Sequence, residues 1–365
     1  MKTTLTLPNA QTIPLAILPV PQAYQPIEDR KVLWEVGPQQ HVLQQLTHLI
    51  DQAKEMICVQ SFIMDDNPVV NALVRAADRG VTVFVTGATV KLSPPEEEPE
   101  FRVESYKRLL EEKFKHRFLF RAADHFHAKF ILIDPETRPA GILLTANLTD
   151  KALQKNPELA LPLSDLQVKE LYELFRYHFW EQAQEEHTDR KEFAATQAAG
   201  KFQPTKPAHS LFTLQGATQQ YLRDTLLAAI EKAESSISLS TYNLDPAHPV
   251  AQAILAKAQA GIPLQLFFPE REAKIKAACQ PFLDAGAEVF IQPFLHAKAL
   301  LVDGKEGFVF SANVEKRGLD EGWEAGIPLN ESQTQVMKQL FADWASGFGR
   351  LSAPAKRAMP HARRC

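Results

Sequence analysis

The stretch "DHFHAKFILID", residues 124–134, sets polar side chains into a run that otherwise suits a buried strand. His127 and Lys129 stand two positions apart near its start, and Asp134 closes it. Polar groups within an apolar run cost free energy unless they find partners. The stretch is therefore either a tolerated irregularity or part of a site, and a second stretch further along the chain decides between these two interpretations.

The second stretch is "HAKALLVD", residues 296–303, in which His296, Lys298 and Asp303 repeat the spacing of the first. Both copies read HxKxxxxD. One copy alone would be weak evidence, because a surface or core histidine is the more common explanation. The same pattern twice in one chain, at matching places, is strong evidence for a site.

Each copy leads into another apolar run that ends in a hydroxyl residue, an alanine and an asparagine. Side chains alternate along a strand, so the histidine and lysine of each copy face one side, as do the hydroxyl residue and asparagine that follow. These following pairs are Thr145 with Asn147 and Ser311 with Asn313. Asp134 and Asp303 have the opposite parity, so we interpret them as supports that fix the strand end or a neighbouring cation, and not as proton carriers.

The two motifs belong to an internal repeat. Residues 49–85 align with residues 229–268, with Gly80 on Gly261 after a one-residue gap. Each copy reads as helix, apolar strand, helix, glycine turn and apolar strand, the alternation typical of βαβ units. We predict an α/β fold with two similar domains, each a mostly parallel sheet flanked by helices, related by pseudo-twofold symmetry. The expected domains are residues 1–204 and 205–365, divided within a linker-like segment rich in charge, alanine, glycine and proline.

The composition suits a globular protein with two cores. The chain has 365 residues, 45% of them hydrophobic and 23% charged, and a net charge of −4, which gives no general attraction to polyanions. Cys58, Cys279 and Cys365 are far apart, so neither a disulfide framework nor a structural zinc site is indicated. We expect a reducing, cytoplasmic setting, because the N-terminal residues make a poor signal peptide and no run is long enough to span a bilayer.

The doubled motif resembles the phospholipase D superfamily, and the resemblance extends from about residue 40 to about residue 345. It includes "NPELAL" and "GWEAGI", which follow the two copies. The resemblance implies that the halves pack so that the motifs meet in one active site, for which a monomer suffices. It implies that one histidine forms a covalent phosphohistidine, that the other protonates the leaving oxygen, and that neither a metal nor another cofactor is required.

The resemblance also implies a role for each polar residue. We expect Lys129, Lys298 and both asparagines to hold the non-bridging phosphate oxygens, with Thr145 and Ser311 as substrate-binding hydroxyls. Glu158 and Glu324 are the expected orienting acids, and the sequence leaves open which of them serves which histidine. We favour His127 as the nucleophile. Because one imidazole must be neutral and the other protonated, we expect a bell-shaped pH dependence.

Three functions remain open from the sequence. The favoured one is phospholipid head-group hydrolysis or phosphatidyl transfer, with peripheral membrane contact for which the basic tail at residues 355–365 is the candidate. The second is a metal-independent nuclease that cuts DNA or RNA at the same site. It predicts a basic groove built from residues such as Lys107, Lys113, Lys115, Arg117 and Arg121. The third is a non-catalytic phosphate-binding module, which the retention of every polar group in both copies disfavours.

Overall fold

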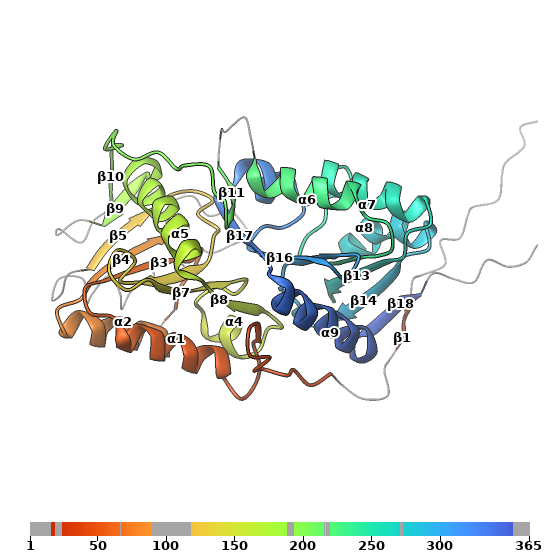
Figure 1. Ribbon diagram of the computed structural model, residues 1–365, viewed down its shortest axis with the longest axis horizontal. Coiled ribbons are helices and arrows are strands. Elements are labelled where there is room, and N and C mark those ends of the chain that lie inside the picture. The colour runs from red at the N-terminus through yellow and green to blue at the C-terminus, as the bar shows by residue number, and fades with distance from the viewer. Residues whose placement is uncertain are drawn as a thin grey trace, which may run out of the picture.

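The computed structural model describes residues 16–18, 24–65, 67–89, 118–187, 193–214, 216, 220–270 and 273–352. Within these residues the chain forms two nine-stranded sheets, one for each half of the repeat, that lie side by side (Figure 1). Residues 90–117 lie outside the described residues, and so do residues 353–365. Four of the five basic groove residues and the basic tail are therefore not placed.

The first sheet has the strand order β10-β9-β5-β4-β3-β6-β7-β8-β2. Its strands are β2 Trp34–Glu35, β3 Met56–Gln60, β4 Thr82–Gly87, β5 Phe118–Ala122, β6 Phe130–Ile133, β7 Ala140–Leu144, β8 Leu159–Pro162, β9 Glu185–His187 and β10 Phe193–Ala195. Its helices are α1 His41–Gln52, α2 Pro68–Asp78, α4 Asp150–Gln154, α5 Asp165–Tyr177 and the π-helix η1 His178–Gln182.

The second sheet has the order β1-β18-β14-β13-β12-β15-β16-β17-β11, which matches the first sheet position by position. Its strands are β1 Ala16–Leu18, β11 Leu211–Thr213, β12 Ile237–Ser240, β13 Leu264–Pro269, β14 Glu288–Gln292, β15 Ala299–Val302, β16 Glu306–Phe310, β17 Glu324–Pro328 and β18 Gly349–Ser352. Its helices are α6 Tyr221–Glu231, α7 Pro249–Gln259, α8 Ala273–Asp284, α9 Glu331–Gly347 and the π-helix η2 Arg317–Glu321.

The prediction of two similar α/β domains is confirmed, but the sheets are mixed and not mostly parallel. Three neighbouring strands run parallel in each sheet, β3-β4-β5 and β12-β13-β14. The other strand pairs are antiparallel within the described residues. The strands after the parallel ones turn back because the connections from β5 to β6 and from β14 to β15 are short. A strand that ran in the same direction would need a crossover of a dozen or more residues.

Local sequence signals explain how the repeated helices begin and end. Helix α2 begins with Pro68 at its first turn, and the Asn67 side chain accepts hydrogen bonds from two backbone N–H groups of that turn. Gly80 and Gly261, which follow α2 and α7, have φ angles of +93° and +91°. Glycine adopts this left-handed conformation without strain, which explains why both copies of the repeat carry it there.

Three apolar clusters form the core. One lies between the first sheet and helices α1 and α2, and another between the second sheet and helices α6, α7 and α8. The third joins the two halves and contains Phe175 of α5, Trp323 and Trp344 of α9. Helices α5 and α9 thus lie on the inner side of each sheet, toward the other half (Figure 1). None of the described helices is long and apolar enough to cross a bilayer.

The chain passes between the sheets twice. Strand β10 ends in the first sheet at Ala195 and β11 begins in the second at Leu211, so the expected boundary falls in the segment between them. This segment is fixed along α5 and η1, where the Glu181 carboxylate accepts three backbone N–H groups and Glu170 accepts two more. Strand β1, within the range expected for the first domain, pairs with β18 of the second sheet.

Candidate active site

Each HxK segment crosses the carboxyl edge of the parallel strands. His127 and Lys129 lie between β5 and β6, and His296 and Lys298 lie between β14 and β15. The strand before each segment is parallel to β3 or β12, and the strand after it is antiparallel to the same strand. Each connection therefore stays at one edge of its sheet, which is where the open ends of parallel strands leave room for a ligand.

The backbone of each segment is held by the other half of the molecule. The N–H groups of His127 and Ala128 donate to the Trp323 carbonyl oxygen at 3.1 and 2.7 Å. The N–H groups of His296 and Ala297 donate to the Pro157 carbonyl oxygen at 3.0 and 3.1 Å. The two segments are thereby brought together across the interface, as the resemblance implied.

The carboxylate of each half orients the imidazole of the other half. His127 Nδ1 lies 2.7 Å from Glu324 Oε1, and His296 Nδ1 lies 2.6 Å from Glu158 Oε1. Both carboxylates are buried, whereas the His127 and His296 side chains keep 21% and 15% of their exposure. A carboxylate that accepts the Nδ1 proton leaves the Nε2 lone pair free. This crossed pairing answers the question that the sequence left open.

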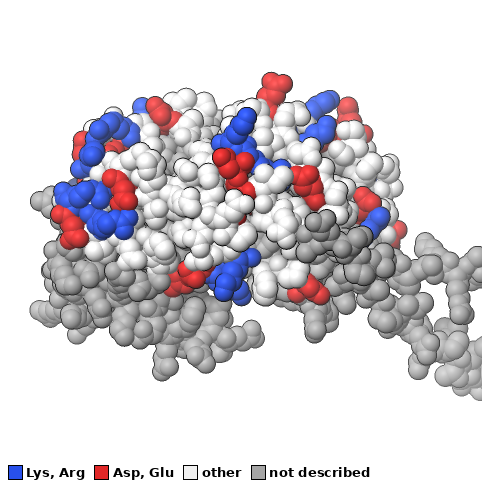
Figure 2. All heavy atoms as spheres, turned by 90° about the horizontal axis from the view of Figure 1, so that it is seen from below, with Lys and Arg blue, Asp and Glu red and all other residues white. Residues whose placement is uncertain are grey.

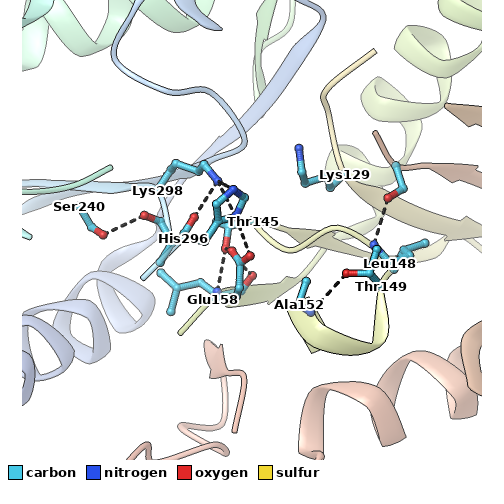
Figure 3. A network of polar contacts seen from close by, with 12 residues as sticks. Lys129, Thr145, Leu148, Thr149, Ala152, Glu158, Ser240, His296 and Lys298 are labelled. Carbon is cyan, nitrogen blue, oxygen red and sulfur yellow. Dashed lines mark hydrogen bonds and ion pairs between the residues drawn. The ribbon is translucent and has the colours of Figure 1, made fainter. Parts of the chain in front are cut away.

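The two hydroxyl residues hold the orienting carboxylates. Thr145 Oγ1 donates to Glu158 Oε2 at 2.6 Å, and Ser311 Oγ donates to Glu324 Oε2. Both residues are fully buried. We expected them to bind substrate, but in the structure each hydroxyl proton is used to fix the second oxygen of an orienting glutamate. Figure 3 shows this arrangement for Thr145 and Glu158.

The two lysines are buried, and each contacts the histidine of its own motif. Lys298 Nζ lies 2.9 and 3.1 Å from the two ring nitrogens of His296 and donates to its carbonyl oxygen, while Lys129 Nζ donates to the carbonyl oxygen of His127. In Figure 3, Lys129 lies across from His296 and Lys298. Burial lowers the pKa of Lys129 to about 7 and that of Lys298 to about 8, although Glu158 and Glu324 act in the opposite direction.

Burial also shifts the pKa values of the histidines and of the glutamates that pair with them. It lowers the pKa of His127 and lowers that of His296 to about 4, more than the paired glutamates raise them. Burial alone would raise the pKa of Glu158 and Glu324, but the facing imidazole and lysine outweigh it, so both carboxyls have a lowered pKa. When no phosphate is bound, these shifts favour the neutral form of both imidazoles and the ionised form of both carboxyls.

The asparagines and two aromatic rings complete the site. Within the described residues, the buried Oδ1 atoms of Asn147 and Asn313 make no hydrogen bond. The Phe62 ring meets the His127 imidazole edge-on at a centroid distance of 5.3 Å, and the Tyr242 ring meets His296 at 4.5 Å. Sequence reasoning missed these rings, although they are aligned with each other in the repeat. They restrict how each imidazole can rotate.

Asp134 and Asp303 lie away from the imidazoles. The Asp134 carboxylate accepts the backbone N–H groups of residues 54–56, and the Asp303 carboxylate accepts those of residues 234–236. Both aspartates have left-handed backbone φ angles, of +40° and +53°. Each ties the end of its motif strand to the turn that enters β3 or β12, and so helps to position the motif.

The chain is similar to several known proteins. The family model for "Cardiolipin synthase, PLD-like domain" matches residues 46–181 and 226–344, which include both motifs. Cardiolipin synthase 1 of Bacillus anthracis is 30% identical over 131 residues, which are 33% of this chain and 26% of that protein. The aligned region thus spans about a quarter of the relative's length.

Solved structures share the fold across nearly the whole chain. Phosphatidylserine synthase of Haemophilus influenzae has a TM-score of 0.62 at 13% identity and covers 93% of this chain and 89% of its own. Polyphosphate kinase of Porphyromonas gingivalis has a TM-score of 0.57 at 17% identity and covers 93% of this chain and 51% of its own. At such identities the likeness shows the fold alone. From the family match over both halves, the chain belongs to the cardiolipin synthase, PLD-like domain family of the phospholipase D superfamily.

Proposed function

We propose that this chain is a phosphodiesterase of the phospholipase D type that hydrolyses or exchanges the head group of a phospholipid through a phosphohistidine. The crossed pairs His127–Glu324 and His296–Glu158 carry the proposal. They supply two imidazoles, each held at Nδ1 by a carboxylate, so that the Nε2 atoms can serve as nucleophile and proton donor in a two-step displacement.

The first step forms the covalent intermediate. The His127 Nε2 lone pair attacks phosphorus, and a P–N bond forms as the P–O bond to the leaving alcohol breaks. His296 gives its Nε2 proton to that oxygen, so the alcohol leaves neutral. His296 has a pKa near 4 without substrate, and an anionic phosphodiester beside it favours the protonated imidazole. Substrate binding therefore charges the proton donor.

The second step reverses the roles of the groups. A water or a second alcohol gives its proton to His296 as its oxygen attacks phosphorus, and the P–N bond breaks to restore His127. Lys129, Lys298 and the two asparagine amides stabilise the non-bridging oxygens in both steps. The lysines do this only when protonated, and a phosphate anion between them raises the pKa of both.

A phospholipid is favoured over a nucleic acid. The family model and the relative above are described as cardiolipin synthases. Arg121, the one described residue of the expected basic groove, pairs with Glu186 at 2.7 Å and lies over the Trp180 ring at 4.6 Å. On the face shown in Figure 2, basic side chains alternate with acidic ones and form no continuous basic track over the described residues.

The test is head-group release from phosphatidylglycerol and phosphatidylcholine vesicles in EDTA, with single- and double-stranded DNA and RNA in parallel reactions. We expect the wild-type chain to turn over lipid and His127→Ala and His296→Ala each to lose activity by at least about 10³-fold. The matched control is His125→Asn, two residues before His127, because asparagine tolerates the left-handed φ of +66° found there. Undiminished lipid turnover in both alanine variants would refute the proposed site.

A further inference from the structure

Phe294 is an exposed aromatic residue in a backbone conformation that does not suit it. Its relative exposure is 59%, the highest of the large apolar residues that are exposed in the described part of the chain. Its φ angle is +62°, and the Leu295 N–H donates to the Gln292 carbonyl oxygen across a four-residue turn. Phe294 is the third residue of this turn, a position with positive φ that glycine and asparagine favour.

Packing around Phe294 does not compensate for its strained backbone conformation. A non-glycine residue in the left-handed region is strained, and a bulky aromatic one is unusual there. Buried packing can compensate for such strain, but more than half of the Phe294 side-chain surface faces solvent. A strained and exposed aromatic residue beside a reaction centre is a reason to look for a ligand.

Phe294 lies at the rim of the proposed active site. It precedes His296 by two residues, and Lys151 Nζ of the first half lies over its ring at 4.6 Å from the centroid. Lys151 is exposed and belongs to α4, which begins three residues after Asn147. The pair therefore joins the two halves between a motif histidine and a motif asparagine.

The equivalent turn in the first half carries a polar residue. His125 precedes His127 by two residues and has almost the same φ angle, +66°. Its side chain is 22% exposed and lies 3.0 Å from the Asp124 carboxylate. The two halves thus share the turn, but the turn carries a histidine in the first half and a phenylalanine in the second. The rim of the site therefore has one polar side and one apolar side.

We propose that Phe294 and Lys151 form the contact between the rim of the site and a phospholipid surface, an inference that rests on the proposed function. The Phe294 ring enters the boundary between head groups and acyl chains, and the Lys151 ammonium binds lipid phosphate beside it. This contact brings the site to a phosphodiester that stays in its bilayer. A lipid surface accounts for both the apolar ring and the cation.

The experiment measures binding of the full chain to sedimented vesicles of phosphatidylglycerol and phosphatidylcholine. We expect Phe294→Gly to weaken binding about tenfold, because burying an aromatic ring contributes on this scale. The same variant should melt at an equal or higher temperature, since glycine relieves the turn. Loss of binding with unchanged or improved stability separates membrane contact from misfolding.

The matched control is Leu166→Asn. Leu166 is 53% exposed and lies in the first turn of α5. Glu158 directly precedes β8, whereas Leu166 follows the opposite end of that strand and so lies away from the site. Its loss should leave vesicle binding unchanged. Lys151→Glu should weaken binding to phosphatidylglycerol vesicles and should have a smaller effect on pure phosphatidylcholine, because only the first surface is anionic.

Sedimentation does not depend on turnover, so this test is separate from the test of the proposed function. If Phe294→Gly loses vesicle binding but the wild-type chain turns over no lipid, the proposed activity is overturned and the membrane contact stands. Unchanged vesicle binding in Phe294→Gly would overturn the inference, whatever the activity. A loss of single-stranded DNA binding in this variant, with vesicle binding intact, would also overturn it and would assign the ring to base stacking.

Discussion

At the residue scale, the candidate site depends on two buried carboxylates. Each pairs with the histidine of the opposite half, and this pairing could not be predicted from the sequence. Glu158 and Glu324 follow their own motifs in sequence, yet each orients the histidine of the other motif. The resemblance to the phospholipase D superfamily implies that both are orienting acids. The sequence contains no signal for the exchange, which depends on how the two halves dock.

The crossed pairing predicts the effect of removing each carboxylate charge. We expect Glu324→Gln to lower kcat by roughly 10²–10⁴-fold, because a neutral amide no longer fixes the His127 tautomer or stabilises its cation. Ser311→Ala should have a much smaller effect, since the carboxylate remains. Steady-state rates on vesicles check this, and equal rates for Glu324→Gln and the wild type would contradict the pairing.

The lysines predict the alkaline side of the pH profile. Lys129 and Lys298 have pKa values near 7 and 8 in the free protein, so each loses its proton as the pH rises through that range. In the proposed mechanism the protonated lysines hold the phosphate, and kcat/KM reports the free enzyme. We therefore expect kcat/KM to fall above about pH 7 to 8. A profile that stays flat to pH 10 would contradict this role.

At the scale of elements, the order of strands was harder to predict than the elements themselves. The helices and strands of the repeat follow from apolar periodicity, and the glycine turns after α2 and α7 mark their ends. The mixed sheet does not follow from periodicity, because a buried parallel strand and a buried antiparallel strand have the same apolar pattern. The short connection between β5 and β6, which carries His127, was the available signal.

The motif aspartates act at this scale. Asp134 and Asp303 each accept three backbone N–H groups at the entrance to β3 and β12. We expect Asp134→Asn to lower the free energy of unfolding by about 1–3 kcal/mol, the scale of hydrogen bonds to a buried charged group. Chemical denaturation checks this. The pH profile of the remaining activity should keep its shape, and a shifted profile would indicate a direct chemical role.

Asp303 contributes folding stability that is lost at low pH. Backbone N–H groups lower its pKa to about 2, although burial acts in the opposite direction. Because the folded pKa is below the unfolded one, this contribution is present above about pH 4 and disappears as the pH falls toward 2. The melting temperature of Asp303→Asn should therefore depend less on pH between about 4 and 2 than that of the wild type.

At the scale of the whole molecule, the halves are fastened together outside the active site. The buried Glu35 carboxylate of the first sheet accepts the Trp344 Nε1–H of α9 at 2.9 Å and the Tyr24 hydroxyl at 2.8 Å. Arg30 joins Glu35 to Asp343 at 3.0 and 2.9 Å. Both His–Glu pairs cross the same interface, so this cluster also supports the geometry of the site.

Trp344→Phe tests that coupling. A smaller aromatic ring remains, but the donor to Glu35 is lost. The buried carboxylate with one fewer partner costs about 1–3 kcal/mol, and the volume that the indole filled adds to this cost. We expect one cooperative unfolding transition at a lower temperature, measured by calorimetry. Two separate transitions in the wild-type chain would contradict the view that the halves depend on each other.

The central claim is that one motif histidine carries the phosphate between donor and acceptor. The most direct measurement is the mass of the protein denatured at neutral pH during turnover of a phospholipid, followed by peptide mapping. We predict a phosphatidyl adduct on the peptide that contains His127, absent from His127→Ala. An adduct on His296 would exchange the two roles. Turnover by the His127→Ala/His296→Ala double variant, with no adduct on either peptide, would contradict the account.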